Sequence, residues 1–396
     1  MPIRDSDWFR PVRLTFHSIH VRGKTNWLFL ELSDGDGLTG LAEITATQLQ
    51  RSPASVTARL ANRLRGERLT SDASVLEIAG LGAAELEKDQ VMATAVSGLR
   101  CAVADALARR ANLPLAAYLR ALRDQRGAPP PTVELYANIN RSMLEDDRGP
   151  VDRSPDAFAA MAKQAADNGF TTLKCAPFDE CREPFESPGL PPEADRGLER
   201  VRAAKEAIGA ERTLYVDCHS RFDLESALAL APELRDAGAG WFEEPLDPIK
   251  HQSDVRTVRE KSGLPVAGAE HGYGTDLFRR LVEEEVLDIV MPDVKFCGGP
   301  VEAYRTGVDL ESLRPGTVSM HCPSGPVSLL ASAHATAAFG NVLPLEHAVY
   351  EVEWRHEVLE PHERISDGRF SLPEGPGLGA WVNPLAVEQH GRRWEP

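Results

Sequence analysis

The first part of the chain shows two successive patterns of apolar and polar positions. From about residue 12 to 46 apolar and polar residues alternate, as in WLFLEL at 27–32, and this alternation predicts strands with one buried face. The sequence DGDG at 34–37 separates two such runs and predicts a hairpin turn. From about 53 to 125 the apolar residues recur every three or four positions, which is typical of amphipathic helices. Strands followed by helices predict an α+β domain over residues 1–127.

A different pattern follows the proline-rich break APPP at 128–131. Short apolar runs typical of buried strands recur eight times, with helical stretches between them. They cover residues 134–139, 171–176, 213–219, 240–245, 265–271, 287–293, 317–323 and 343–349. Alternating strands and helices imply parallel pairing through right-handed crossovers, and eight such units close a barrel.

We therefore expect an α/β protein with a (β/α)8 TIM-type barrel over residues 132–350 and an N-terminal α+β capping domain. The last segment, 351–396, includes a short apolar run, RFSL at 369–372, and is expected to return to the capping domain. The alternative is an open, doubly wound sheet. No GxGxxG motif follows the first predicted strand, which disfavours that alternative.

The net negative charge of the chain disfavours some classes of binding partner. The 396 residues include 44 Lys and Arg against 60 Asp and Glu, for a formal net charge of -16. Nucleic acid and anionic lipid favour clustered positive charge, so we expect neither as a partner. The first ten residues, MPIRDSDWFR, contain no apolar signal-peptide core, and no run of about 18 apolar residues occurs in the chain. These observations predict a cytoplasmic protein that acts on a small molecule.

Polar side chains stand at the ends of nearly all the predicted barrel strands, which is where a barrel builds its active site. They are Asn138, Lys174, Asp217 with His219, Glu243 with Glu244, Glu270 with His271, Asp293 with Lys295, His321, and Glu346.

Three of these residues, Asp217, Glu243 and Glu270, come from successive strands. Three carboxylates that face one point repel one another unless a cation lies among them. Ligation by oxygen alone, with positions left for water and substrate, suits Mg2+. The sequence therefore predicts one Mg2+ per chain, and the alternative is three separate solvated carboxylates.

The motifs around the strand ends resemble the mandelate racemase branch of the enolase superfamily. They are GFTTLK at 169–174, YVDCH at 215–219, WFEEP at 241–245, GAE at 268–270, MPDVKFCGG at 291–299, MHCPSGPVS at 320–328 and PLEH at 344–347. NWLFLEL at 26–32 and GLTGLAEIT at 37–45 resemble the capping lobe of that family. The resemblance implies a Mg2+-dependent enzyme that removes the proton next to the carboxylate of a small-molecule substrate. It also implies a homo-oligomer.

The resemblance assigns roles to single residues. His321 matches the general base, and Asp293 matches the acid that fixes the tautomer of its ring. Lys174 matches a lysine that faces the substrate carboxylate, and Glu346 matches an acid that hydrogen-bonds the same group. Racemases of the family keep a second lysine where this chain has Ala176, so a two-base racemase is not implied.

His219, two residues after Asp217 and followed by Arg221, resembles the acid-sugar dehydratases of the family, the galactonate type among them. In those enzymes this histidine is the general acid that protonates a departing β-hydroxyl group. We therefore predict a dehydratase, a lyase that removes water from a polyhydroxy acid through an enediolate. A purely structural role for His219 is the alternative. The competing functions are an isomerase, either a one-base cycloisomerase or an epimerase that uses Lys174 or Lys295 on the opposite face, and a catalytically silent ligand-binding barrel.

Substrate contacts are predicted for Asn138, Trp27 and Lys295 in addition to Lys174. The capping loops near 17–26 and 44–53, together with the insertion near 178–192, are expected to determine which sugar acid fits.

Overall fold

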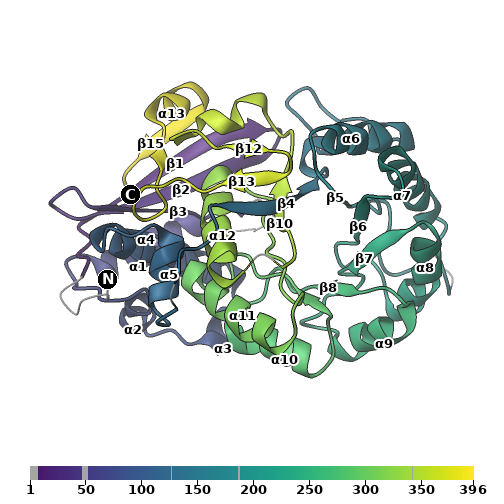
Figure 1. Ribbon diagram of the computed structural model, residues 1–396, viewed down its shortest axis with the longest axis horizontal. Coiled ribbons are helices and arrows are strands. Elements are labelled where there is room, and N and C mark those ends of the chain that lie inside the picture. The colour runs from purple at the N-terminus through teal and green to yellow at the C-terminus, as the bar shows by residue number, and fades with distance from the viewer. Residues whose placement is uncertain (1–7, 47–51, 126, 186–187, 341) are drawn as a thin grey trace.

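The first lobe is a small sheet covered by helices. The computed structural model describes residues 8–46, 52–125, 127–185, 188–340 and 342–396 (Figure 1). Strands β1 (Arg13–Arg22), β2 (Thr25–Ser33) and β3 (Thr39–Glu43) form antiparallel pairs, as their alternating pattern predicts. At the predicted hairpin turn, the Asp34 carboxylate accepts hydrogen bonds from the backbone N–H groups of Asp36 and Leu38, at 2.9 and 2.8 Å. Five helices follow: α1 (Pro53–Leu64), α2 (Ser74–Ala79), α3 (Ala83–Leu86), α4 (Gln90–Arg110) and α5 (Leu115–Ala121).

Helix α4 forms the centre of this lobe. It is long and apolar enough to cross a membrane, but 94% of its most apolar 18-residue stretch is buried inside the protein. It packs against β3 and α1 and also contacts the barrel helix α11 (Gly299–Leu313). A Cβ atom at Gly98 would lie 2.2 Å from Ile44, so glycine allows the helix and the sheet to approach this closely. We conclude that α4 is a core helix that joins the two lobes.

The second lobe is the barrel. Its parallel strands are β4 (Thr132–Asn138), β5 (Thr172–Cys175), β6 (Thr213–Asp217), β7 (Ala239–Glu243), β8 (Val266–Gly268), β9 (Ile289–Val290) and β10 (Leu345–Ala348). Their helices are α6 (Pro155–Asp167), α7 (Ala194–Ile208), α8 (Leu224–Asp236), α9 (Gln252–Ser262), α10 (Thr275–Glu283), α11 and α12 (Pro326–Phe339). Strand β10 pairs back with β4. The predicted TIM-type barrel with an N-terminal capping domain is confirmed.

The seventh predicted strand is less regular than the pattern suggested. Residues 317–323 make a single bridge, between Val318 and Val290, in place of a continuous ladder. Backbone hydrogen bonds still join the segment to both neighbours, from His321 N to the Pro292 carbonyl and from Glu346 N to the Met320 carbonyl, each at 3.1 Å. The segment therefore occupies the seventh position of the barrel and places His321 at its carboxyl end.

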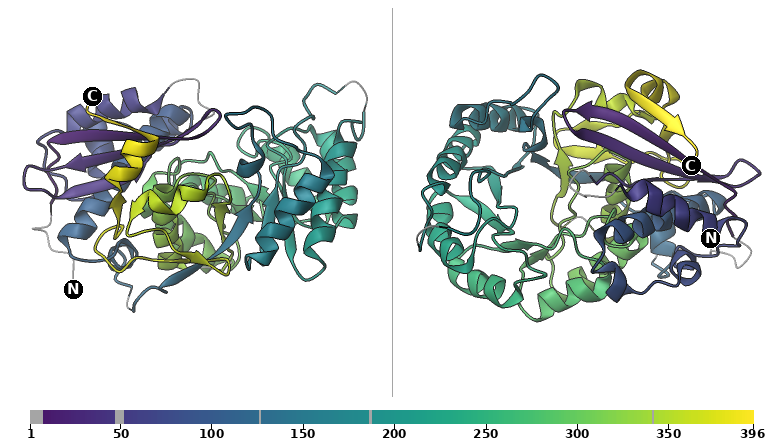
Figure 2. Two further views of the ribbon diagram at one scale, coloured as in Figure 1. Left: turned by 90° about the horizontal axis from the view of Figure 1, so that it is seen from above. Right: turned by 180° about the vertical axis from the view of Figure 1, so that it is seen from behind.

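The C-terminal segment pairs with strands of both lobes (Figure 2). Its elements are η2 (Glu353–Glu357), β11 (Leu359–Glu360), β12 (Ile365–Ser366), β13 (Arg369–Ser371), β14 (Trp381–Val382), α13 (Pro384–His390) and β15 (Gly391–Trp394). Strand β13 pairs antiparallel with β4, so the apolar run at 369–372 lies against the barrel and not in the capping sheet. Strand β15 pairs antiparallel with β1 and is the edge strand of the capping sheet.

A buried histidine joins three parts of the chain. His334, on α12, accepts a hydrogen bond through Nδ1 from the backbone N–H of Ala116, at 3.2 Å, and its Nε2 lies 3.2 Å from the Leu378 carbonyl. The imidazole is therefore neutral, with its proton on Nε2. Burial lowers the pKa of His334 from 6.5 to about 4.

We expect His334 to make the protein less stable in acid. The unfolded chain binds a proton on this residue below pH 6.5, whereas the folded chain binds it only near pH 4. The stability that depends on the neutral ring is therefore complete above pH 6.5 and falls by about 3 kcal/mol as the pH drops to 4. Urea unfolding of the wild type and of His334→Gln, at pH 7.5 and pH 5, measures this effect. The substitution should flatten the pH dependence, whereas His362→Gln, at an exposed position, should leave it unchanged.

Candidate active site

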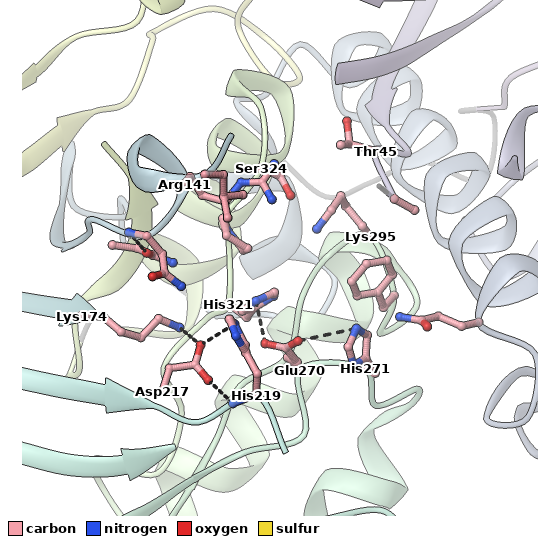
Figure 3. A pocket seen from close by; sticks show the side chains of 17 residues that line it. Thr45, Arg141, Lys174, Asp217, His219, Glu270, His271, Lys295, His321 and Ser324 are labelled. Carbon is pink, nitrogen blue, oxygen red and sulfur yellow. Dashed lines mark hydrogen bonds and ion pairs between the residues drawn. The ribbon is translucent and has the colours of Figure 1, made fainter. Parts of the chain in front are cut away.

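A cavity of about 140 Å3 opens at the carboxyl ends of the barrel strands, beneath the capping domain (Figure 3). The predicted site residues that line it are Asn138, Lys174, Asp217, His219, Glu270, Lys295 and His321. The other four predicted site residues lie behind the residues that line the cavity and are almost completely buried: Trp27, Glu243, Asp293 and Glu346. The capping domain contributes Thr45, Ala46 and Gln90, so the cavity is shared between the two lobes.

The three predicted metal ligands come from neighbouring strands but pair with side-chain cations. Asp217 and Glu243 are register partners at the ends of β6 and β7, and Glu270 follows β8. Glu243 accepts hydrogen bonds from Lys174 Nζ at 2.6 Å and from Trp241 Nε1 at 3.1 Å. Over the part of the chain that the structure describes, no three His, Cys, Asp or Glu side chains are grouped as a metal site. The donor set is nevertheless chemically suited to a hard cation, because all three residues offer carboxylate oxygens.

Lys174 lies at the centre of the acidic cluster. Its ammonium is 2.6 Å from Glu243, 2.8 Å from Glu346 and 3.7 Å from Asp217. Burial disfavours the charged amine, but Glu243 and Glu346 outweigh this effect, and the pKa of Lys174 is raised well above its ordinary value. The amine is therefore protonated at neutral pH.

His321 and Asp293, the predicted base and the acid predicted to orient it, are in direct contact. His321 Nδ1 is 2.8 Å from Asp293 Oδ2, and the same carboxylate oxygen accepts a hydrogen bond from Lys295. His321 Nε2 is 2.8 Å from Glu270 Oε2, on the cavity side. Burial disfavours the charged ring, but Glu270 and Glu346 raise the pKa of His321 well above its ordinary value. Lys295 is thus bound to the acid that orients His321.

His219 contacts a different acid of the site, Asp217 of β6 (Figure 3). Its Nε2 is 3.1 Å from Asp217 Oδ2, and the pKa of His219 is raised, mainly by the charge of that carboxylate. The backbone of His219 is left-handed, with φ of 50°, which is unusual for a residue other than glycine. The ring lines the cavity and is about one-third exposed. A charged imidazole in this position can donate a proton into the cavity.

Asn138 and Glu346 form a fixed pair at the ends of β4 and β10. The Asn138 side chain donates a hydrogen bond to Glu346 Oε1 at 2.6 Å, and the Cys322 N–H donates to Glu346 Oε2 at 2.9 Å. Both oxygens of Glu346 are therefore engaged within the protein. Only Asn138 of the two reaches the cavity wall.

Trp27 supports the site from behind and does not reach the cavity. Its side chain is fully buried, edge-on to Trp354 and beneath the guanidinium of Arg355. A Cβ atom at Gly325 would lie 2.8 Å from the Trp27 ring and 2.8 Å from the carboxylate of Glu43. The predicted substrate contact of Trp27 is therefore replaced in this structure by packing under the loop that follows His321.

The capping domain also fixes that loop through Glu43, at the end of β3. Its carboxylate accepts hydrogen bonds from the backbone N–H groups of Gly325 and Ser328, each at 2.8 Å, at the first turn of α12. A carboxylate is favourable there because the N-terminal end of a helix carries partial positive charge and unpaired N–H groups. Burial raises the pKa of Glu43. The position of the loop after His321 therefore depends on the capping sheet.

Several cavity residues were not predicted from the sequence. Thr45 belongs to the predicted capping loop near 44–53, but Arg141, in the short helix η1 (Arg141–Met143) after β4, and Gln90, in the capping domain, lie outside the predicted loops. They belong to irregular segments or helix starts, where apolar periodicity gives no indication of function. The loops expected to shape the cavity are described only in part, since residues 47–51 and 186–187 lie outside the described residues.

Two family descriptions match this chain. The family described as "Enolase C-terminal domain-like" matches residues 157–386, and the mandelate racemase/muconate lactonizing enzyme N-terminal domain matches residues 2–119. The chain belongs to the enolase superfamily. Its capping lobe and its barrel correspond to these two descriptions, and the resemblance of the sequence motifs is confirmed.

Relatives of this enolase-superfamily protein include named dehydratases. D-xylonate dehydratase of Haloferax volcanii is 36% identical over 199 residues, which is 50% of this chain, and the chain spans about half of that enzyme, 48%. D-galactonate dehydratase of Pectobacterium atrosepticum is 24% identical, with 92% of this chain and 91% of the enzyme covered. A mandelate racemase/muconate lactonizing enzyme-like structure from Rubrobacter xylanophilus superposes with a TM-score of 0.82 at 25% identity, over 97% of this chain and 98% of the other.

Membership of the enolase superfamily gives the acidic cluster a chemical context, because sites of this superfamily pair a Lys or His base with Mg2+. Ala176, where family racemases keep a lysine, is buried, and its backbone N–H donates to Asn140. The amines that line the described cavity are those of Lys174 and Lys295, and each is bound by carboxylates. Neither is placed as a free second base.

Proposed function

We propose that this protein is a Mg2+-dependent dehydratase that removes water from a polyhydroxy sugar acid. The observation that carries the proposal is the pair of histidines in one cavity, His321 bound to Asp293 and His219 bound to Asp217. One can accept the proton next to the substrate carboxylate, and the other can donate a proton to the departing hydroxyl group. The dehydratase relatives from Haloferax and Pectobacterium support this reaction class.

The chain's own residues provide the acid and base steps. Asp293 holds His321 with Nδ1 protonated, so that Nε2 takes the α-proton and an enediolate forms. His219 then protonates the β-hydroxyl group as the carbon–oxygen bond breaks, and the resulting enol becomes a 2-keto acid. Lys174 holds the substrate carboxylate by charge.

A magnesium ion is proposed to be held by Asp217, Glu243 and Glu270. When bound, it supplies positive charge that stabilises the enediolate and offsets the carboxylates that keep His321 protonated. We also propose that the substrate contacts Asn138 and that Lys295 acts indirectly, through Asp293. The metal assignment rests on carboxylates at neighbouring strand ends, and the assignments of Asn138 and Lys295 rest on their positions in the cavity wall.

A library screen tests the function. The purified protein would be incubated with Mg2+ and a set of aldonic and aldaric acids, and each mixture would be assayed for a 2-keto-3-deoxy acid. Water loss from at least one acid supports the proposal. Epimerisation of an acid without water loss would instead identify an isomerase, and the absence of α-proton exchange in D2O with every acid would indicate a barrel that binds without catalysis.

We expect His219→Gln to separate proton abstraction from water loss. The variant should lower the rate of dehydration about a thousand-fold, because it removes the proton donor for the departing hydroxyl group. It should retain exchange of the α-proton with D2O, because His321 is intact and abstraction precedes elimination. Proton NMR of the best substrate follows both processes in one sample. Formation of the 2-keto acid at the wild-type rate would remove His219 from the mechanism.

A further inference from the structure

The two halves of the cavity differ in charge. The two acids among the described lining residues, Asp217 and Glu270, lie in the half that also holds Lys174 and the histidines (Figure 3). The other described lining residues are neutral, apart from the cations Arg141 and Lys295. A substrate that extends from the reacting half therefore meets positive charge and neutral side chains at its far end.

Arg141 is the cation that is available for binding in the far half. Its Nε donates to Glu351 at 3.3 Å and its Nη2 donates to Thr25 at 3.3 Å, both rather long contacts. Its Nη1 makes no hydrogen bond to any residue within the described ranges. Lys295, by contrast, is bound to Asp293. The guanidinium of Arg141 therefore keeps donors for a ligand.

The surroundings of Arg141 hold it in place. Glu351 is almost fully buried and also contacts Arg355, at 3.4 Å, so its charge is shared between two guanidinium groups. Arg22, at the end of β1, donates to the carbonyls of Ser142 in η1 and of Leu144 directly after it, at 2.7 and 2.8 Å. A guanidinium that is oriented in advance loses little freedom when it binds a ligand.

We propose that Arg141 binds a second carboxylate, at the end of the substrate remote from the reacting carbon, so that the preferred substrates are sugar diacids. A planar guanidinium with free donors matches a carboxylate, which accepts two parallel hydrogen bonds, better than it matches a terminal hydroxyl group. This inference rests on the proposed function and specifies its substrate class. It departs from the printed names of the Haloferax and Pectobacterium relatives, which refer to acids with one carboxylate.

The test compares matched acids that differ at the far carbon alone, galactarate with galactonate and glucarate with gluconate. In the wild-type holoenzyme with Mg2+, the diacid of at least one pair should have a kcat/KM about 100-fold higher than its monoacid. Arg141→Gln should remove this preference by raising KM for the diacid, and Arg141→Lys should restore it in part. Arg148→Gln is the matched control, because Arg148 lies in the same loop, is 91% exposed and contacts Asp146.

Two results would overturn the subsite while leaving the dehydratase in place. One is a wild-type enzyme that turns over monoacids as well as diacids, and the other is an Arg141→Gln variant that slows both classes equally. If no acid of either class loses water, the proposed function fails. Calorimetric measurement of acid binding then tests whether Arg141 forms a carboxylate subsite. Tighter binding of galactarate than galactonate that Arg141→Gln abolishes would then support it, and equal binding of the two acids would refute it.

Discussion

Replacement of His321 by asparagine is expected to lower kcat about ten-thousand-fold, with the fold retained. Asparagine can keep a hydrogen bond to Asp293, but it cannot take a proton from carbon. The ring of His321 lines the cavity, with Nδ1 bound to the buried carboxylate of Asp293 and Nε2 toward Glu270. Loss of α-proton exchange in D2O, measured beside an unchanged circular dichroism spectrum, would show that the abstraction step itself is removed.

His271→Asn is the matched control for this experiment. His271 lines the same cavity, but its Nε2 is 3.6 Å from Glu270 and its ring rests near Phe296. We expect this variant to lose less than about tenfold in kcat, since the contact of His271 with Glu270 is too long for a hydrogen bond that would orient the ring as a base. Should His321→Asn keep the wild-type rate while His271→Asn loses activity, the two assignments would have to be exchanged.

Removal of divalent cations is expected to abolish turnover, and added Mg2+ is expected to restore it. Proton removal next to a carboxylate places two negative charges on one small group, and we expect loss of the ion to reduce the rate about a thousand-fold or more. Activity after dialysis against EDTA, followed by titration with Mg2+, measures the effect. Calorimetry should give one bound ion per chain.

Substitutions of the proposed ligands test where the Mg2+ ion binds. Asp217→Asn and Glu270→Gln should each weaken Mg2+ binding at least about tenfold, because each removes a charged oxygen ligand. Asp247→Asn is the control, since Asp247 follows β7 but its carboxylate contacts Lys250. Full activity in excess chelator, or equal Mg2+ affinity in all three variants, would contradict the proposed ligand set.

The barrel and most of its cavity residues could be predicted from the sequence because two regular patterns coincide. Short apolar runs separated by helical patterns located the barrel strands, and a polar residue at the carboxyl end of such a strand must lie at the rim. Lys174, Asp217 and His321 could be placed in this way. The rotamers could not, because they depend on which opposite charges meet, and Glu243 turns to Lys174 and Trp241.

The sequence pattern could not predict the positions of residues whose neighbours come from distant parts of the chain. Arg141 belongs to a three-residue helix, so no sequence repeat indicates its direction. Trp27 alternates with its neighbours like any inward-facing strand residue, and the pattern cannot distinguish a ring against a ligand from a ring against Trp354. The run at 369–372 has the composition of a strand, but its partner, β4, is fixed by the path of the preceding segment.

The pairing of β15 with β1 also affects how the chain assembles during synthesis. The whole barrel is translated after β1 and before β15, and until then β1 is an open edge of the capping sheet. An open edge with buried apolar residues such as Phe16, which later meets Trp394, can pair with other chains. The edge strand β1 therefore stays unpaired, and prone to aggregation, for most of translation. Chaperones that shield strand edges should increase the yield of folded protein.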